Sequence, residues 1–509
     1  MITFKYFFEF RMKNLKKQMD AFPGACQALF LTVIAFAVWL VYAKTLSGGF
    51  VFDDWSLILH NPDIRLTDFG WTGVANILTD LRPVSTLTFA FNHMAHAYDY
   101  AGYHIVNIGV HIITGILLFF FTKTTLGLPS LDASYGQHKQ ALAYAVCLLW
   151  LFNPVNTQSV SYIVQRQNSM AAMFCLGAML FYAHGRLAKK KAATLLLMVG
   201  GLASGALAFG SKENAFALPA FILIYEWFFF QNATSRWFIR FCLAAMGGAA
   251  AVAAFLYFFL PGMLPLGIIN DGYDIYAFTM EQRLLTELRV LVYYITLIFF
   301  PHPSRLNIDI DFPYSSSWMD PPTTLVSFFL IAGLLALAVA LARKKPLLSF
   351  CVLWFFGSLL MESSVVPLDI IFEHRLYLPS MSVILMAVLL CHRYIPGQKI
   401  KVGVFCVILS VFSIWTCERN GVWAESPMSI YKDSAAKSPE KARPFYNVGC
   451  EYAKLNRPKE AVLWLKRSVG KRKELKWNLA ENLKKDPDFK AIRGSREFLE
   501  LYEKTVGHQ

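Results

Sequence analysis

Charged residues are scarce in this sequence, and the patterns by which proteins usually bind metal ions are missing. Only 16% of the 509 residues are charged, whereas 56% are hydrophobic and 15% are aromatic. No CxxC pair and no Cys/His spacing typical of a zinc site appears. No small-residue cleavage site follows a short apolar region near the N-terminus, so we predict a retained membrane anchor there.

The nine cysteines do not have the pattern of a disulfide framework. Seven of them lie within or beside apolar segments, where cysteine behaves as a small hydrophobe. The other two, Cys417 and Cys450, fall on the predicted outer side, where an oxidising compartment would allow them to pair.

Long apolar segments dominate the chain instead. A bilayer core is about 30 Å thick and needs about 20 helical residues to cross it, and one soluble core would not need so many such segments. We therefore predict an all-α polytopic membrane protein with about 11 transmembrane helices. The predicted spans are 25–44, 104–122, 138–153, 168–187, 193–210, 214–230, 238–260, 323–342, 346–361, 379–393 and 401–417.

The positive charge indicates topology rather than nucleic-acid binding. The net charge is +14, but Lys and Arg cluster in short loops on one side of the predicted helices, as at 189–191 and 343–345. Five basic residues precede the first span, which predicts a cytoplasmic N-terminus and, after 11 spans, an external C-terminus. The apolar segment 288–300 is short and ends at Pro301, so we predict a lateral or re-entrant helix there.

These predictions divide the chain into three parts. A cytoplasmic segment precedes a transmembrane domain, and a charged tail without a spanning segment follows it. The predicted bounds are 1–24 for the segment, 25–417 for the transmembrane domain with outward loops 45–103, 154–167 and 261–322, and 418–509 for the tail.

Most ionisable groups outside the basic loops fall in the outward loops. The acidic pair Asp53-Asp54 follows the first span, Lys212-Glu213 joins two later spans, and Glu373 precedes Arg375 by two positions. An ionisable group beside hydrocarbon is costly and usually has a partner or a function. Their shared side predicts one polar cavity that faces outward.

Helical spacing adds three polar residues to the second span. His104, Asn107 and His111 are three and four positions apart and therefore share one helix face. Structural interpretations stay open for all these groups. The three could hydrogen-bond neighbouring helices, Asp53-Asp54 could cap a helix, and Arg166 could anchor a helix end. Arg82 could end a loop, and Lys212-Glu213 and Glu373 with Arg375 could be ordinary ion pairs.

Several of these motifs follow one another in a specific order along the chain. They are Phe52-Asp53-Asp54, Arg82-Pro83-Val-Ser-Thr, His104-x-x-Asn107-x-x-x-His111, Asn153-Pro154 with Gln165-Arg166, Ser211-Lys212-Glu213 and Glu373-x-Arg375-x-Tyr377. Their order and spacing resemble the transmembrane-and-TPR-containing protein O-mannosyltransferases and their bacterial relatives, which are glycosyltransferases of the GT-C superfamily. The resemblance covers roughly residues 20–470.

The resemblance implies a function. It implies a membrane glycosyltransferase of GT-C type that moves a sugar from a polyprenyl-phosphate donor to a protein Ser/Thr hydroxyl on the outer side, with inversion. It also implies the inner membrane of a bacterium, with the tail in the periplasm. The expected partners are the donor, a protein or glycan acceptor and the bilayer, with no nucleic acid.

Roles follow for individual residues. Asp53 and Asp54 are the catalytic candidates, and the resemblance favours the first of the pair as the base. Cations are needed where charge builds on the leaving phosphate, and the candidates are Arg166, Lys212 and Arg375. The supporting and pocket candidates are Arg82, His104, Asn107, His111, Glu213 and Glu373.

One departure from the family pattern concerns metal binding. The family often has an acidic residue two positions after the arginine matched by Arg166, and here that position is Asn168. We therefore predict no required divalent cation and no other cofactor.

The tail has the spacing of a tetratricopeptide repeat. Residues 445–452 and then Ala461 and Leu465 fit a helix-turn-helix unit with its turn at 456–458. One unit is too few for a stable array, so we expect it to lean on flanking helices or on the membrane domain. It is either a small helical cap or a surface that docks the acceptor.

Other classes stay open. A transporter would also place charges near outward helix ends, but it would be expected to show related halves with Gly/Pro-broken helices, and no such repeat is found. A scaffold that presents the tail would not need the acidic pair. Among enzymes, a lipid or cell-surface glycan acceptor is the alternative to protein.

Overall fold

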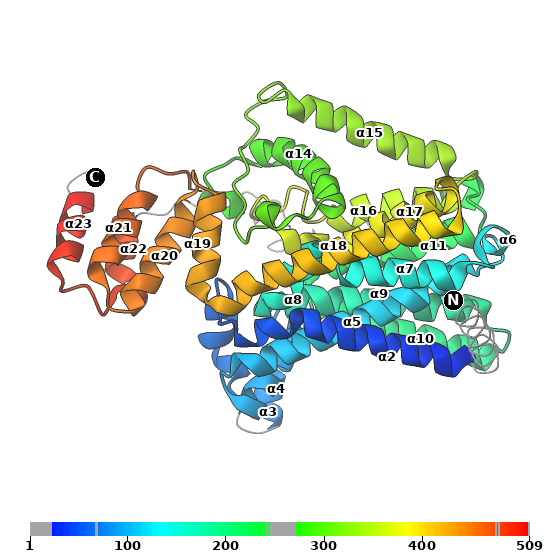
Figure 1. Cartoon of the computed structure of the whole chain (residues 1–509), viewed down its shortest axis with the longest axis horizontal. Coiled ribbons are helices and arrows are strands. Elements are labelled where there is room, and N and C mark those ends of the chain that lie inside the picture. The colour runs from blue at the N-terminus through cyan, green and yellow to red at the C-terminus, as the bar shows by residue number, and fades with distance from the viewer. Residues whose placement is uncertain are drawn as a thin grey trace, which may run out of the picture.

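The protein is a bundle of long helices with a smaller helical tail at one end (Figure 1). The structure is a computed structural model that describes residues 23–66, 70–237, 239–240, 243, 271–473, 476 and 479–506. These residues form helices and connections without a strand, and one isolated β-bridge joins Lys441 to Arg472. The predicted all-α polytopic class is confirmed.

Among the described residues, six helices are long and apolar enough to cross a bilayer. They are α2 (Pro23–Tyr42), α5 (Tyr100–Leu126), α9 (Arg166–Leu187), α10 (Lys191–Phe209), α15 (Thr323–Leu341) and α18 (Gln398–Glu425). Four shorter helices in the described part of the chain also coincide with predicted spans: α7 (Lys139–Leu151), α11 (Leu218–Phe229), α16 (Pro346–Leu359) and α17 (Pro379–Tyr394). Ten predicted spans therefore coincide with helices, and the predicted span 238–260 lies outside the described residues except at 239, 240 and 243.

The shorter helices are supported by buried irregular backbone. At 1.5 Å per residue, the 13 residues of α7 rise about 20 Å, which is less than a bilayer core. After α7 the chain continues through short helical turns, and residues 153–165 are all buried. Non-helical backbone is tolerated near a membrane only where protein encloses it. This segment lies next to the polar residues that are described below.

Helix α14 (Met280–Phe299) is longer than the predicted segment 288–300. Thr279 caps its N-terminus, because the Thr279 hydroxyl accepts a hydrogen bond from the Gln282 N–H at 3.2 Å in a capping box. Its first half carries charged residues, and it is not among the six long apolar helices. Its lateral or re-entrant placement stays a prediction.

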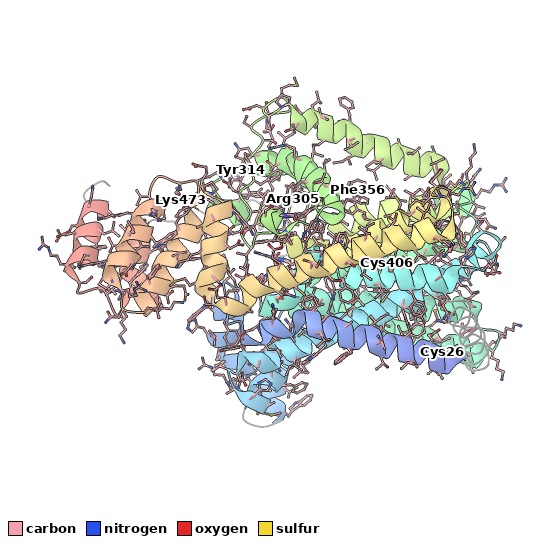
Figure 2. All side chains as sticks on the ribbon, in the orientation of Figure 1. Cys26, Arg305, Tyr314, Phe356, Cys406 and Lys473 are labelled. Atoms are coloured by element: carbon pink, nitrogen blue, oxygen red, sulfur yellow. The ribbon has the colours of Figure 1, made fainter. Side chains whose placement is uncertain are left out.

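Exposed apolar side chains mark the lipid-facing surface. Leu29 and Phe36 on α2 are 67% and 62% exposed, and Phe329 on α15 is 64% exposed. Cys26 and Cys406 lie on the outside of α2 and α18 (Figure 2). Such continuous exposed apolar faces need lipid to cover them. Cys417 and Cys450 are both free thiols, so the pairing that their location allowed is not formed.

The tail begins within a continuous helix rather than at residue 418, because α18 runs on to Glu425. It contains α19 (Pro427–Lys437), α20 (Ala442–Lys454), α21 (Pro458–Ser468), α22 (Leu479–Lys485) and α23 (Arg496–Val506). The helices α20 and α21 form the predicted helix-turn-helix, and Asn456 in the turn has a φ of 54°. Gly449 permits their close approach, since a Cβ there would lie 2.8 Å from Leu465 Cγ.

The tail has its own apolar core and also shares one with the membrane domain. Ala461, Leu465 and Phe489 belong to the first core. Tyr431 and Val448 of the tail pack in the second with Val51 of the first outward loop. The end of the bundle that carries the tail also carries this loop, and the loop 343–345 lies at the opposite end (Figure 1).

Candidate active site

The acidic pair lies in a tight turn after α2. Gly48 begins the turn, and a Cβ there would lie 2.5 Å from the Trp423 carbonyl oxygen of α18, so only glycine fits. Phe52 has a positive φ of 44°, which reverses the chain just before the two carboxylates. The turn thus presents Asp53 and Asp54 to different surroundings.

Asp54 is enclosed and holds the backbone. Its carboxylate accepts from the Val51 N–H at 2.9 Å and from the Val164 N–H at 2.8 Å, and its side chain is fully buried. Burial raises the pKa of Asp54 well above its usual value. One carboxylate oxygen therefore closes the turn on Val51, and the other joins the turn to the segment that precedes α9.

Asp53 is exposed, and the charges of Arg443, Asp369 and Arg82 act on it. Its N–H donates to the Tyr162 hydroxyl at 2.8 Å. Crowding by protein raises the pKa of Asp53, while the charges of Arg443 and Arg82 oppose that rise. The Asp53 carboxylate is thus the accessible member of the pair.

The cations of this region gather around Lys212. The Lys212 ammonium lies 3.8 Å from Glu362 and donates to the Asn168 side-chain oxygen at 3.3 Å. Burial lowers the pKa of Lys212 to about 8; Glu362 opposes this change, and Arg82 and Arg375 add to it. Three cations from separate segments are therefore within electrostatic range of one another.

Arg82 and Arg375 are held differently. Arg82 donates to Glu213 at 2.8 Å and to Gln167, and 29% of its side chain is exposed. Arg375 is buried, and it donates to the carbonyl oxygens of Ile370 at 2.9 Å and Asp369 at 2.7 Å. Carbonyl oxygens carry no formal charge, so the positive charge of Arg375 is opposed only through space, by Glu362, Glu287 and Asp369, while it also acts on Lys212.

We name Asp53, Arg82, Lys212 and Arg375 the charged cluster. Arg82 connects its two parts, since its charge acts on both Asp53 and Lys212. The structure therefore links one predicted carboxylate, through the charge of Arg82, to two of the three predicted phosphate-binding cations. It also brings in Arg82, which the sequence placed in the sugar pocket.

Arg166 lies outside this cluster. It has no exposed surface, and its guanidinium donates to Asn107 at 2.7 Å, Asn92 at 2.5 Å and the Tyr103 carbonyl at 2.9 Å. Its guanidinium carbon also lies 4.6 Å from the Phe89 ring centroid. A guanidinium held in this way has no free face for a phosphate, so in this geometry Arg166 joins helices and does not bind the donor.

The polar face of α5 is likewise used for packing. His104 donates from Nε2 to the Gly48 carbonyl at 3.0 Å, and Asn107 donates to the Val160 and Ile163 carbonyls, each at 3.1 Å. His111 donates from Nε2 to Leu151 at 3.1 Å and accepts from the Tyr377 hydroxyl at 2.8 Å. All three are buried, which favours the open alternative of helix packing over a pocket role.

The two predicted supporting glutamates differ. Glu213 holds Arg82, as expected. Glu373 is fully buried and instead accepts from the Asn307 N–H, with Arg419 and Lys437 as its nearest positive charges. Burial raises the pKa of Glu373 to about 7. The carboxylate beside Lys212 is therefore Glu362 and not Glu373.

Sequence reasoning missed several residues at the cluster. Glu362 lies beside Lys212, and nothing in a single sequence pairs these two residues. The Asn168 side-chain oxygen accepts hydrogen bonds from Lys212 and Asn214, and its side-chain nitrogen donates to the His374 carbonyl at 2.7 Å. Burial and the three nearby cations lower the pKa of His374 well below its usual value, so its imidazole is neutral. These contacts join segments that are far apart along the chain. Spacing along the chain does not reveal such contacts.

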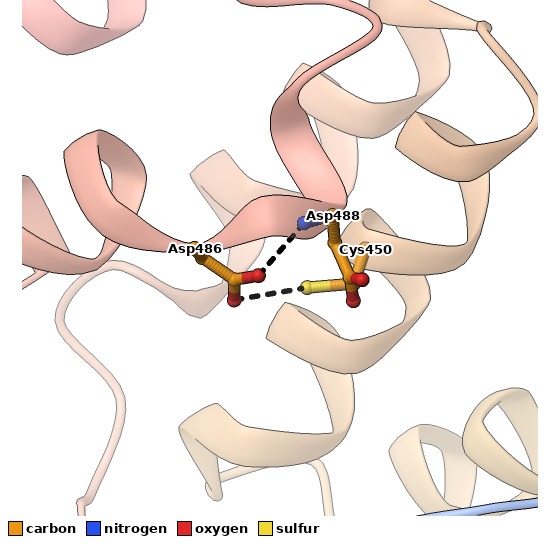
Figure 3. A group of neighbouring side chains, drawn as sticks. All are labelled: Cys450, Asp486 and Asp488. Carbon is orange, nitrogen blue, oxygen red and sulfur yellow. Dashed lines mark hydrogen bonds between the residues drawn. The ribbon is translucent and has the colours of Figure 1, made fainter. Parts of the chain in front are cut away.

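One group of possible metal ligands occurs among the described residues, and it lies in the tail. Cys450, Asp486 and Asp488 are its members (Figure 3). Asp486 caps a helical turn through the Asp488 N–H at 3.0 Å and accepts from the Tyr446 hydroxyl at 2.7 Å, and Asp488 pairs with Lys454 at 3.6 Å. These contacts make the group a structural junction. The expectation that no metal is required stays a prediction.

The fold and the cluster define a class: a polytopic, all-α membrane protein with a charged cluster at the end of the bundle that carries a helical tail. Comparisons with known proteins narrow it. A protein O-mannosyl-transferase of Caenorhabditis elegans is 22% identical over 428 residues, which is 80% of this chain and 58% of that protein. Human protein O-mannosyl-transferase TMTC3 is 23% identical over 484 residues, or 82% of this chain and 49% of that protein.

Another match is shorter but has a higher sequence identity. Human protein O-mannosyl-transferase TMTC1 is 30% identical over 172 residues, which is 31% of this chain and 18% of that protein. The chain spans about half the length of the two relatives that it matches over most of its own length. No family model and no solved structure matches it. The chain is thus a relative of the protein O-mannosyl-transferases, as its motifs predicted.

Proposed function

We propose that this protein is a membrane glycosyltransferase that moves a sugar from a polyprenyl-phosphate donor to a Ser/Thr hydroxyl of a protein. The observation that carries the proposal is the placement of the exposed Asp53 carboxylate in the charged cluster with Arg82, Lys212 and Arg375. The names of the relatives support a protein acceptor and make mannose the first sugar to test.

The reaction follows from the charges of the cluster. The acceptor oxygen attacks the anomeric carbon, a new carbon–oxygen bond forms, and the bond from that carbon to the phosphate oxygen breaks. Polyprenyl phosphate leaves with one more negative charge than it had in the donor. Preplaced cations stabilise that developing charge, and Lys212, Arg375 and Arg82 supply it here.

Asp53 accepts the proton of the acceptor hydroxyl in this scheme. A carboxylate is a weak base for an alcohol, so proton transfer is late, and the pKa of Asp53, which the surrounding protein raises, makes it a better base. Asp54 keeps the turn in place through its two backbone hydrogen bonds. A single displacement predicts inversion at the anomeric carbon.

Three further assignments belong to the proposal. The reaction takes place on the outer side of the membrane, because the cluster lies at the end opposite the basic loop 343–345, which the positive-inside rule places in the cytoplasm. The tail is then external and is a tetratricopeptide-like unit beside the acceptor. Arg166 is not included among the donor ligands.

The test uses purified protein, a mannosyl polyprenyl phosphate and a Ser/Thr-rich peptide. We expect Asp53→Asn to lower transfer about 100-fold or more while the protein stays folded in detergent. The neighbouring Asp54→Asn variant is the matched comparison, and it is expected to lower thermal stability first, because its buried side chain holds the backbone. Unchanged transfer by Asp53→Asn would remove Asp53 from the mechanism.

The acceptor is tested in the same assay. Lipid and glycan acceptors replace the peptide in parallel reactions, and the anomeric configuration of the product is measured. Transfer to a glycan or lipid but not to the peptide would replace the protein acceptor in the proposal. A retained configuration would exclude a single displacement.

A further inference from the structure

The tail is joined to the membrane domain by a dense set of polar contacts. We name residues 303–311, which follow α14, the strap. The Lys437 ammonium donates to the strap carbonyls of Pro303 at 2.8 Å and Leu306 at 2.9 Å. The Ser438 hydroxyl donates to the Asp309 carbonyl at 2.8 Å. After the strap, the guanidinium carbon of Arg472 in the tail lies 5.1 Å from the ring centroid of Tyr314, which is labelled in Figure 2.

Arg443, in the first turn of α20, lies at the centre of this junction. Its guanidinium donates from Nε to Asp309 at 2.8 Å and from Nη2 to the other Asp309 oxygen at 2.5 Å. Its Nη1 donates to Asp369 at 3.2 Å. One tail residue therefore binds the strap and also the loop that positions Arg375, whose guanidinium donates to the Asp369 carbonyl.

The bidentate contact is a strong one. Asp309 is fully buried, and burial opposes its ionisation, but Arg443 and Lys441 outweigh that effect and hold the pKa of Asp309 well below its usual range. A planar guanidinium fits a carboxylate with two parallel hydrogen bonds, which a lysine ammonium cannot do. The geometry thus specifies arginine at position 443.

Arg443 also lies next to the turn that carries Asp53 and Asp54, which we name the catalytic turn. Its guanidinium carbon is 5.5 Å from the ring centroid of Phe52, the residue before Asp53. Phe52 is itself held by the tail, since its N–H donates to the Tyr431 hydroxyl at 3.1 Å. Arg443, Asp369, Tyr162 and Arg82 act most strongly on Asp53, and among them the charge of Arg443 has the largest effect. The carboxylate of Asp53 also acts on its chain neighbour Asp54.

We propose that Arg443 is a positioning residue for glycosyl transfer, through which the docked tail completes the active site. Its guanidinium holds the loop of Asp369 and Arg375, and its positive charge keeps Asp53 ionised and able to act as a base. The tail therefore contributes to the chemical step and is more than an acceptor-binding module. This inference rests on the proposed function.

The experiment compares Arg443→Gln, Arg443→Lys and Lys441→Gln in the full-length protein. Transfer rates are measured across the pH range, with thermal unfolding in detergent as the check on folding. Without the Arg443 charge, Asp53 should bind its proton more tightly, so the acid limb of the pH profile moves to higher pH. We expect the rate of Arg443→Gln on that limb to fall about tenfold more than its rate at the plateau.

The two comparison variants separate charge from structure. Arg443→Lys keeps the charge and loses the bidentate contact, so it should lower the rate at all pH values without moving the limb. Lys441→Gln removes another cation from Asp309, and the charge of Lys441 is not among the largest influences on Asp53, so its limb should move less than that of Arg443→Gln. If the acid limb of Arg443→Gln stays where it is in the wild type, the inference is overturned. It is also overturned if the acid limb of Lys441→Gln moves by the same amount as that of Arg443→Gln.

A failure of the proposed function would be distinguishable from a failure of this inference. If the wild type transfers no sugar, the protonation of Asp53 is followed by infrared difference spectroscopy, with Asp53→Asn identifying its carboxyl band. The band should titrate at higher pH in Arg443→Gln than in the wild type. An identical titration would overturn the role of Arg443 without reference to any substrate.

Discussion

At the scale of the residue, the two neighbouring aspartates show how one turn separates two tasks. Asp54 spends both oxygens on backbone N–H groups and is buried, whereas Asp53 keeps accessible surface. Identical side chains thus differ in function because the positive φ of Phe52 directs them to different surroundings. A buried carboxylate with both oxygens occupied cannot reach an acceptor hydroxyl.

The lysine of the cluster makes a prediction about pH. Burial lowers the pKa of Lys212 to about 8, and only its protonated form can bind a phosphate. As the pH rises through about 8, Lys212 loses its proton, so kcat/KM for the donor should fall. Lys212→Arg should move this fall to higher pH, because an arginine stays charged. The measurement is kcat/KM for the donor against pH.

A lysine far from the cluster provides the control for that measurement. Lys139 pairs with Asp132 on the exposed surface, and Lys139→Arg should leave the profile of the wild type unchanged. If Lys212→Arg keeps the alkaline limb of the wild type, Lys212 does not bind the donor phosphate in its charged form.

At the scale of the element, Arg166 joins three helices. It begins α9 and donates to Asn92 of α4 (Pro83–His96), to Asn107 of α5 and to the Tyr103 carbonyl of α5. Arg166→Met would leave these buried acceptors without a donor, at a cost of about 3 kcal/mol or more. We expect a clear drop in the thermal unfolding temperature in detergent, and an unchanged KM for the donor in the folded fraction.

Arg82→Met should show the opposite pattern. The ion pair of Arg82 with Glu213 is partly exposed, and such pairs contribute about 1 kcal/mol or less. Stability should therefore change little, while transfer falls because a cation is lost from the cluster. A higher donor KM in Arg166→Met without loss of stability would return Arg166 to the donor site.

At the scale of the whole molecule, the tail and the membrane domain share an apolar core beside the turn that carries Asp53 and Asp54. Val51 of the catalytic turn packs in the same core as Tyr431 and Val448. Removal of residues 426–509 should therefore expose this core and also remove Arg443. We expect lower thermal stability and a loss of donor turnover as well as of acceptor use, in a comparison of both substrates with the full-length protein.

This expectation differs from the one that the sequence suggested, in which a docking tail affects the acceptor most. A truncated protein that turns over the donor normally and loses only the acceptor would restore that simpler picture. It would also count against the role of Arg443.

Hydropathy and charge distribution along the sequence were enough to predict the all-α class, ten helices at the predicted spans, and the motifs that lie at the end of the bundle that carries the tail. These properties depend on local composition, because an apolar segment of sufficient length becomes a helix in a bilayer wherever it occurs. The sequence therefore also located Asp53, Lys212 and Arg375 in loops that lie together.

Only the tertiary structure decided what each polar group does. Arg166 and Arg375 have the same chemistry, but the first is surrounded by acceptors from α4 and α5, and the second lies beside Lys212. Glu373 faces the tail, Glu362 lies beside Lys212, and Arg443 reaches the catalytic turn from 390 residues away along the chain. Hydrogen bonding and charge act through space over a few ångströms, so these roles are set by packing between distant segments and not by spacing along the chain.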